Sequence, residues 1–379
     1  SWLVVKINNL NFFKEEAEKK IGGKIEFYIP KLKNEKRIGN KISQKETNLL
    51  GNYAFFKCEK FNNKTVNILR FCKGLKMATK LDPTDPQYKP PRHNTYEAWQ
   101  EEQNIPQITG FFIEDINTVE VSHWDLKGVP CAFVNLEGTG GTNDAYVCEI
   151  PPGAHTEPQK HMYEEMVYVT KGEGATTVWQ EGGPKHTFEW GAGSLFAIPL
   201  NARYQHFNGS GQNPVRYYAV TNCCFVMNLF HNVDYIFNSD YSFNDRFDPQ
   251  NEDYFSGDGE LLGRFFLSTN FVPDLLTLAL ADYSERGKGS TNMKFDLARN
   301  TMGAHTSEFP TGTYKKAHRH GPGANVIILS GQGYSTLWKG DEEPTRVDWK
   351  PGSVIVPPDQ WFHQHFNSGA SSARYLALR

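Results

Sequence analysis

GTYKKAHRHGPGANVIILSGQG, the stretch from Gly312 to Gly333, places His318 and His320 two residues apart in a segment whose pattern predicts a β-strand. Residues i and i+2 of a strand face the same side of a sheet, so both imidazoles are expected to point the same way. Further along the chain, WFHQHFN supplies His363 and His365 with the same spacing. Four histidines on the inward faces of two strands predict a cup that binds a metal.

The same stretch occurs twice, and the two copies are separated by a constant offset. Residues 153–208 and 312–367 align without a gap, and nine of their identical positions mark the repeated motifs and the tryptophans between them. These nine pairs are Gly153 and Gly312, His161 and His320, Gly172 and Gly331, Trp179 and Trp338, Trp190 and Trp349, Gly193 and Gly352, Pro199 and Pro358, His206 and His365, and Asn208 and Asn367. Identities at one offset over this length indicate an internal duplication.

The repeated motifs resemble those of the cupin family. Its first motif is Gly, five residues, His-x-His, three or four residues, Glu, six residues and Gly. Its second motif is Gly, five residues, Pro, four residues, His, three residues and Asn. The resemblance covers residues ~120–379, and two motifs found twice in register make it specific. It implies a bicupin: a mainly β fold of two tandem cupin barrels (double-stranded β-helix, jelly-roll-like), preceded here by a small α+β domain.

In the second copy, the resemblance implies a metal held by His318, His320 and His363. Ala324 stands where the family has its metal-binding glutamate, which leaves three histidines. His365 faces the same side as His363 and is the candidate catalytic residue, as a general base, a fourth ligand or a donor behind the ligands. Its counterpart His206 is also a histidine, which fits a repeated packing role as well.

The first copy offers a second, degenerate set at the same positions: Gln159, His161, Glu165 and Tyr204. These are four nitrogen and oxygen groups, but glutamine is a poor ligand and tyrosine must lose a proton with a pKa of ~10 to bind strongly. We therefore favour packing over a second catalytic metal in this copy.

Cupins with three histidine ligands are often iron dioxygenases, so the resemblance implies an Fe(II)-dependent, dioxygenase-type oxidoreductase acting on a small organic substrate. Imidazole also suits Mn, Ni, Zn and Cu. Without the glutamate, the charge at the metal is one unit more positive, which favours an anionic, chelating substrate. The alternative from another class is a non-catalytic small-ligand-binding or storage-type bicupin. Either class is compatible with a homo-oligomer.

Charged residues are distributed unevenly along the chain, although its net charge is only −3. Residues 1–76 contain 17 Lys and Arg against 7 Glu and no Asp, which is +10, whereas the rest contains 23 basic and 36 acidic residues, which is −13. All histidines and methionines lie after residue 76, and Met77 resembles a translation start inside the chain. The two parts are therefore expected to be separate units.

The pattern of residues 1–76 predicts a small α+β domain. Strands are expected at residues 1–7, 25–33 and 48–59, a helix at 12–21 and a helix or strand at 65–72. This order, with Trp2, FYIP at 27–30 and LLGNYAFF at 49–56, resembles the N-terminal domain of NusG-type transcription elongation factors. The resemblance implies contact with RNA polymerase and a transcription-elongation-like function. A basic, solvated module without a specific partner is the equal alternative.

The remaining chain is expected to divide into a linker or arm at 77–110, a first barrel at 111–220, a connector at 221–262 and a second barrel at 263–379. A short helix is expected within the arm, at NTYEAWQEEQ (residues 94–103). No apolar run approaches the ~20 residues of a membrane span, and no signal peptide opens the sequence. The six cysteines show no CxxC spacing, so we expect reduced thiols and a cytoplasmic protein without membrane contact.

Overall fold

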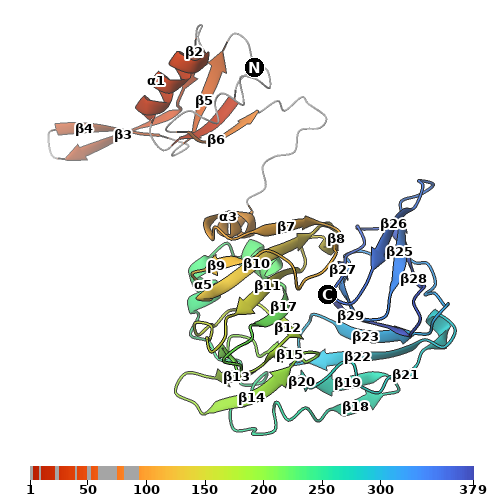
Figure 1. Ribbon diagram of the computed structural model, residues 1–379. Helices are drawn as coiled ribbons and strands as arrows, with labels where there is room; N and C mark the ends of the chain where they lie inside the picture. Colours follow the sequence, from red (N-terminus) through yellow and green to blue (C-terminus); the bar gives the residue numbers. More distant parts are fainter. Residues whose placement is uncertain are drawn as a thin grey trace. The chain divides into compact units, whose positions relative to one another are not determined.

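The computed structural model describes residues 3–7, 10–21, 25–38, 41–48, 53–58, 75–80 and 94–379. The chain divides into two compact units, residues 1–93 and residues 94–379, and each is described by itself (Figure 1). Among the described residues, no helix combines the length and the apolar character that crossing a membrane requires.

The N-terminal unit contains one described helix and an antiparallel sheet with the strand order β2-β5-β1-β6. Its elements are β1 (Leu3–Ile7), α1 (Leu10–Ile21), β2 (Ile25–Tyr28), β3 (Lys31–Ile38), β4 (Lys41–Asn48), β5 (Tyr53–Cys58) and β6 (Leu75–Lys80). Val5 and Ile7 of β1 pack with Phe13 and Ala17 of α1, because alternate strand residues and one helix face supply the apolar side chains. A separate hairpin is formed by β3 and β4.

Two boundaries in this unit differ from the sequence prediction, and β4 was not expected. The strand expected over residues 25–33 is divided between β2 and β3, with Pro30 between them. The boundary expected after residue 76 falls inside β6, which pairs with β1 so that Met77 lies opposite Lys6. The segment at 65–72 and most of the linker before residue 94 lie outside the described residues.

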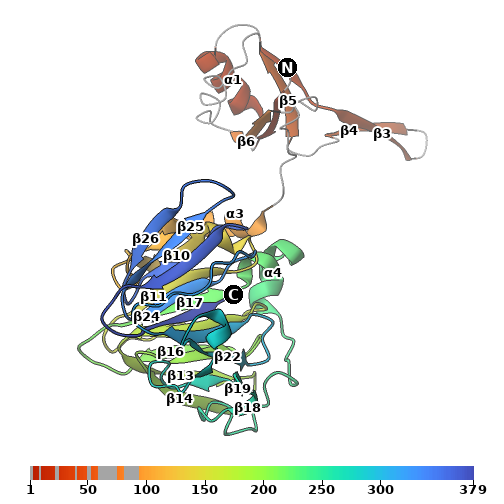
Figure 2. The same cartoon turned by 90° about the vertical axis from the view of Figure 1, so that its right-hand side faces the viewer.

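The second unit begins with α3 (Thr95–Glu102), the short helix expected in the arm. The Asn94 side chain caps it by accepting a hydrogen bond of 3.0 Å from the backbone N–H of Glu97. Two β barrels follow, each made of one large and one three-stranded sheet (Figures 1 and 2). The fold class expected from the sequence is confirmed: the protein is mainly β, with two tandem cupin-type barrels after a small α+β unit.

In the first barrel, the large sheet has the order β20-β15-β12-β17-β11-β10-β7, with β9 on β10, and the small sheet has the order β14-β13-β16. The strands are β7 (Gln107–Gly110), β9 (Ser122–Trp124), β10 (Val129–Leu136), β11 (Asp144–Ile150), β12 (Glu165–Lys171), β13 (Glu173–Trp179), β14 (Lys185–Gly191), β15 (Leu195–Ile198), β16 (Arg203–Asn208), β17 (Val215–Thr221) and β20 (Phe271–Val272). The helices α4 (Cys223–Phe230) and α5 (Val233–Asn238) follow β17.

In the second barrel, the large sheet has the order β18-β19-β22-β23-β29-β24-β27-β8, with β21 on β22, and the small sheet has the order β26-β25-β28. The strands are β8 (Phe112–Ile113), β18 (Glu260–Gly263), β19 (Phe266–Thr269), β21 (Ala281–Asp282), β22 (Thr291–Leu297), β23 (Ala304–Phe309), β24 (Asn325–Ser330), β25 (Gly333–Trp338), β26 (Thr345–Trp349), β27 (Val354–Ile355), β28 (Phe362–Asn367) and β29 (Ala373–Leu378).

The two barrels exchange one short strand each. Strand β8 precedes most of the first barrel in the sequence but pairs with β27 of the second, and β20 precedes most of the second barrel but pairs with β15 of the first. The separation of these two strands in the sequence equals the offset of the duplication, so they are equivalent elements of the two copies. The exchange places residues 112–113 and 271–272 in the barrel opposite to the one that the sequence prediction gave them.

The glycine that opens the second motif in each copy is required by this exchange. Gly193 and Gly352 have φ angles of +96° and +90°, which side chains other than glycine rarely adopt. A Cβ on Gly352 would lie 2.5 Å from Oδ1 of Asp115, and one on Gly193 would lie 2.7 Å from Oδ1 of Asp274. The backbone of each glycine therefore lies directly against the segment that follows the exchanged strand.

Apolar packing is divided among the inside of each barrel and the contact between them. The interior of the first barrel is filled largely by aromatic side chains, such as Trp124, Phe133 and Tyr204. A second cluster joins the large sheets of both barrels, with members such as Met166 and Ile327. The interior of the second barrel holds a smaller cluster around Phe309. The second barrel thus has room for a cavity where the first is packed.

Candidate metal centre

The three histidines expected to bind a metal lie together in the second barrel. His318 forms an isolated bridge to His363 of β28, with backbone N–H···O distances of 3.1 and 2.9 Å. His320 follows two residues later in the same extended segment. One potential ligand atom from each of His318, His320 and His363 lies within 4.8 Å of the other two. Ring centroids of His318 and His363 are 4.3 Å apart.

Local hydrogen bonds orient two of these rings for ligation. The Nδ1 atom of His318 lies 3.1 Å from the carbonyl oxygen of Lys316, and that of His363 lies 3.3 Å from the carbonyl oxygen of Trp361. A neutral imidazole that donates from Nδ1 keeps its lone pair on Nε2, the tautomer that binds a metal through Nε2. The Nδ1 atom of His320 is buried and has no hydrogen-bond partner.

All three rings are held in the neutral form. Burial, the charge of Arg286 and the neighbouring His320 lower the pKa of His318 to about 4. Burial and the neighbouring histidines lower the pKa of His363 to about 2. Burial also lowers the pKa of His320. Neutral imidazoles are the form that binds Fe, Zn, Ni, Cu and Mn, so the residues present fit a divalent transition metal. Ala324 is buried nearby and provides no fourth ligand.

His365 belongs to a hydrogen-bonded chain that both barrels contain. Its Nδ1 lies 2.7 Å from the Ser335 hydroxyl, which accepts a hydrogen bond of 3.0 Å from the indole of Trp349. In the first barrel, Nδ1 of His206 lies 2.7 Å from the Thr176 hydroxyl, which likewise accepts from Trp190. His365 lines the cavity beside His363, but it is not part of the three-histidine group.

In the first barrel, the expected second set surrounds a buried lysine. The Nζ atom of Lys127 donates hydrogen bonds of 2.8 Å to the hydroxyls of Tyr146 and Tyr204, and lies 4.0 Å from Oε2 of Glu165. The Nε2 atom of His161 is 3.4 Å from the same carboxylate oxygen. The ammonium therefore stands among the groups that would otherwise face a metal ion.

The other two members of that set are also unsuited to metal binding in this arrangement. Gln159 turns away, since its side-chain amide donates to the carbonyl oxygen of Leu126 at 2.6 Å. Burial raises the pKa of Tyr204 well above its usual value, and the charge of Glu165 adds to this effect. The phenolate that a tyrosine ligand requires is thus strongly disfavoured.

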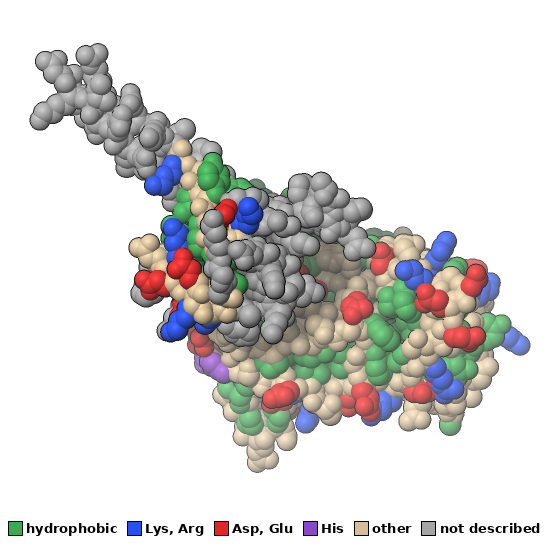
Figure 3. Space-filling view, turned by 90° about the horizontal axis from the view of Figure 1, so that it is seen from above, with side chains coloured by type: hydrophobic (Ala, Val, Ile, Leu, Met, Phe, Trp, Pro, Cys, Tyr) green, Lys and Arg blue, Asp and Glu red, His purple; other side chains and the backbone are tan. Residues whose placement is uncertain are grey.

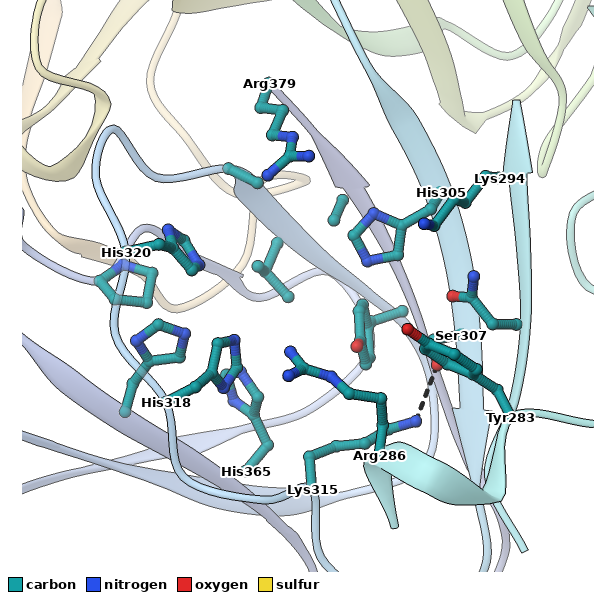
Figure 4. Close-up of a pocket in the computed structure, with 17 residues that line it drawn as sticks. Tyr283, Arg286, Lys294, His305, Ser307, Lys315, His318, His320, His365 and Arg379 are labelled. Atoms are coloured by element: carbon teal, nitrogen blue, oxygen red, sulfur yellow. Dashed lines mark hydrogen bonds between the residues drawn. The ribbon is translucent and has the colours of Figure 1, made fainter. Parts of the chain in front are cut away.

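The three histidines open onto a cavity of about 210 Å³ in the second barrel (Figure 4). Its other titratable lining residues come from β22, β23, β28, β29 and the loops around them. They are Tyr283, Arg286, Lys294, His305, Lys315, His365, Tyr375 and Arg379. The sequence analysis identified four histidines of this barrel, at positions 318, 320, 363 and 365. It did not identify the basic residues of the lining, which are Arg286, Lys294, Lys315 and Arg379, nor Lys127 in the first barrel.

One signal in the sequence could have identified two of the missed residues. Lys127 and Arg286 are separated by the same offset as the repeated motifs, and the backbone confirms that they are equivalent. The N–H of Glu157 donates to the Lys127 carbonyl and the N–H of Lys316 donates to the Arg286 carbonyl, at 2.8 and 3.0 Å. Extending the repeat upstream of its motifs would have shown a basic residue at this position in both copies.

Comparison with known proteins finds one matching family. Residues 146–221, which lie in the first barrel, match the family described as "Cupin domain". No curated protein matches the sequence. Similar solved structures include a formate complex of oxalate decarboxylase from Lactobacillus farciminis, with 14% identity, a TM-score of 0.45 and coverage of 71% of this chain and 85% of that one.

Two further structures show the same degree of similarity. The W96Y oxalate decarboxylase of Bacillus subtilis has 15% identity and a TM-score of 0.46, covering 79% of this chain and 87% of that one. Vicilin from Corylus avellana (hazelnut) has 11% identity and a TM-score of 0.46, covering 71% and 85%. Within the first barrel, residues 146–221 are thus similar to a cupin domain, and the duplication repeats the same architecture in the second barrel.

Proposed function

We propose that this protein is a metal-dependent oxidoreductase of the dioxygenase type that acts on a small organic substrate in the second barrel. One observation carries the proposal: three neutral imidazoles, from His318, His320 and His363, meet within 4.8 Å at a cavity of about 210 Å³. Fe(II) is the metal we favour, with Mn, Ni, Zn and Cu as the other candidates for a site made of imidazoles.

The residues around the site define what the chain contributes. When bound, a divalent iron with three neutral protein ligands keeps positions open for a substrate and for O₂. Ala324 supports this arrangement, because a glutamate at its position, like Glu165 in the first barrel, would add a negative ligand. The volume restricts the substrate to a small molecule, since pockets for drug-sized ligands usually measure about 300–1,000 Å³.

For His365, we infer a positioning role behind His363 rather than proton transfer. Burial lowers its pKa to about 3, and neighbouring groups that include His318 and Lys315 add to the shift, so it is a weak base. The same histidine, hydroxyl and tryptophan chain is present in the first barrel around His206, where Lys127 occupies the centre. The arrangement is therefore compatible with a barrel that performs no chemistry.

The test is the metal content of purified variants. The wild-type chain, purified and supplied with Fe(II), should bind one metal ion per chain; His320→Ala should lose it and His161→Ala should retain it, as measured by elemental analysis. Loss of metal in His161→Ala but not in His320→Ala would overturn the choice of barrel. O₂ uptake with a panel of small organic acids then separates the two classes: stoichiometric metal without turnover on any of them supports the binding or storage-type alternative.

This proposal concerns residues 94–379. The resemblance of residues 1–76 to NusG, and the RNA polymerase contact that it implies, stay predictions from the sequence. Their test is a pull-down of RNA polymerase with the full chain.

A further inference from the structure

All of the charged side chains that line the cavity of the second barrel are basic. Arg286, Lys294, Lys315 and Arg379 all reach it, and its lining contains no aspartate or glutamate. Among the described residues, none of these four side chains forms an ion pair, whereas Arg374, on the same strand as the cavity residue Tyr375, pairs with Glu308 at 2.8 Å. On the face shown in Figure 3, by contrast, basic and acidic side chains are interspersed among the described residues.

Comparison with the first barrel shows that the fold does not require these charges. Strand pairing and backbone hydrogen bonds match Arg286 to Lys127, Lys294 to Phe133, Lys315 to Thr156 and Arg379 to Thr221. At these four positions the first barrel has one cation, Lys127, which is faced by the carboxylate of Glu165. The second has four cations, and Ala324 has replaced the carboxylate. Both changes make the second cavity more positive.

Lys315 is the most informative of the four. It is only 4% exposed, and its Nζ donates a hydrogen bond of 2.8 Å to the Ser307 hydroxyl (Figure 4). A buried ammonium without a counter-ion destabilises a protein, so its presence here needs a compensating interaction. Burial lowers its pKa to about 7, and the charge of Arg286 contributes to this shift. A bound anion would provide the missing negative charge.

Arg286 extends into the same space. Figure 4 shows its guanidinium group pointing into the cavity, between the histidines on one side and His305 on the other. Its charge contributes, after burial, to the lowered pKa values of His318 and His365, which places it within electrostatic reach of the candidate metal centre. A guanidinium binds a carboxylate through two parallel hydrogen bonds, a geometry that a lysine cannot supply.

We propose that the second-barrel cavity binds a small organic carboxylate, whose anionic group is held by Arg286 and Lys315 beside the three histidines. This inference rests on the proposed function for the identity of the site, but not on the metal for its binding energy. It assigns Arg286 and Lys315 to recognition of the substrate and leaves the histidines to the metal. The small volume favours acids with a few carbon atoms.

The experiment measures binding of malonate and succinate to the full chain by isothermal titration calorimetry, with the matched uncharged diamides, malonamide and succinamide, as probes of the same shape. It is done on the protein as purified and again after a chelator has removed metal. We expect at least one of the two acids to bind in both samples, with affinity that falls as salt is raised, and the diamides to bind at least 10-fold more weakly.

Variants locate the site. Lys315→Met and Arg286→Gln should each weaken carboxylate binding at least 10-fold while metal content stays at the wild-type level. Lys339→Met removes an exposed lysine outside the cavity and should change neither quantity. Lys315→Met should also unfold at a temperature equal to or above that of the wild type, because it replaces a buried charge with an apolar chain of similar length.

Three results would overturn the inference: diamides that bind as tightly as the acids, wild-type affinity in both variants, or inorganic phosphate binding more tightly than either carboxylate. Its failure is distinguishable from failure of the proposed function. A chain that binds no metal but loses carboxylate binding in Lys315→Met and Arg286→Gln keeps the anion site and refutes the metal. A chain that binds stoichiometric metal but no carboxylate keeps the metal site and refutes the anion site.

Discussion

Replacing Lys127 with methionine should destabilise the protein at neutral pH without affecting metal in the second barrel. The change keeps a side chain of similar length but removes the charge that faces Glu165, whose carboxylate is fully buried. Breaking a buried ion pair by removing one partner typically costs about 3–5 kcal/mol. For a unit of this size, that corresponds to a drop of roughly 5–10 °C in the unfolding temperature.

The pH dependence identifies the cause. Burial alone would raise the pKa of Glu165, but the charge of Lys127 and the hydrogen bond from His161 outweigh it and hold the pKa at about 2, below the usual 4.5. In the wild type, the carboxylate therefore contributes stability above pH 4.5 that is lost as pH falls toward 2. In Lys127→Met, burial raises the pKa above its unfolded value, so the stability deficit should shrink as pH falls from 7 toward 4 and the carboxyl takes up a proton.

Differential scanning calorimetry at pH 7 and pH 4.5 measures both effects. Glu165→Gln is the matched single variant, and the double variant Lys127→Met/Glu165→Gln should recover most of the loss, because no unpaired charge stays buried. A double-mutant cycle gives the coupling energy between the two residues. The reasoning fails if Lys127→Met unfolds at the wild-type temperature at pH 7, or if its deficit is the same at both pH values.

Three further outcomes are expected for the metal, the anion and the N-terminal unit. Metal affinity should be nearly constant between pH 9 and about pH 5 and fall only below that, since the pKa values of His318 and His363 are about 4 and about 2; a titration that weakens already at pH 6.5 would contradict this. Carboxylate affinity should weaken as pH rises from 7 to 9, because Lys315, with a pKa of about 7, loses its proton; calorimetry at constant ionic strength tests it, with Lys315→Met as the pH-independent control. A chain that starts at Asn94 should fold and bind as much metal as the full chain, because β6 pairs within the first unit; circular dichroism and elemental analysis check this, and an insoluble product would count against it.

The parts of the fold that follow from local pattern and repetition could be predicted. Two barrels were evident because nine identities at one offset require the same architecture twice. The approach of His318 to His363 followed from the same motifs, although the structure shows His318 in an extended bridge rather than in a full strand. Spacing of two residues predicted the common direction of the rings in either case.

What depends on contacts between distant parts of the chain could not be predicted. Lys127 lies in a turn between β9 and β10, far from any motif, and a single lysine in a turn normally indicates solvent exposure. Its burial becomes clear only when Tyr146 and Tyr204 are seen around it. Likewise, the change in composition at Met77 marked a difference in sequence character, but the strand that crosses it is defined by pairing with β1.

Short elements escaped prediction for a different reason. Strands β8 and β20 contain two residues each, which is too few to show any periodicity. The segments that follow them are hydrogen-bonded to the two glycines: the N–H of Ile116 donates to the Gly352 carbonyl and that of Leu275 to the Gly193 carbonyl, each at 2.9 Å. The sequence contains these residues but shows nothing of their proximity.

The strand exchange makes the two barrels a single cooperative unit. Opening the second barrel at β27 also releases β8, whose chain continues directly into the first barrel, and opening the first at β15 releases β20, which continues into the second. Four cations without ion-pair partners in one cavity destabilise a barrel. Here, unfolding of the second barrel must also disrupt the densely packed first barrel. Stability of the first barrel should therefore support the second: substitutions that stabilise the aromatic interior around Lys127 should also raise the temperature at which the three-histidine barrel unfolds.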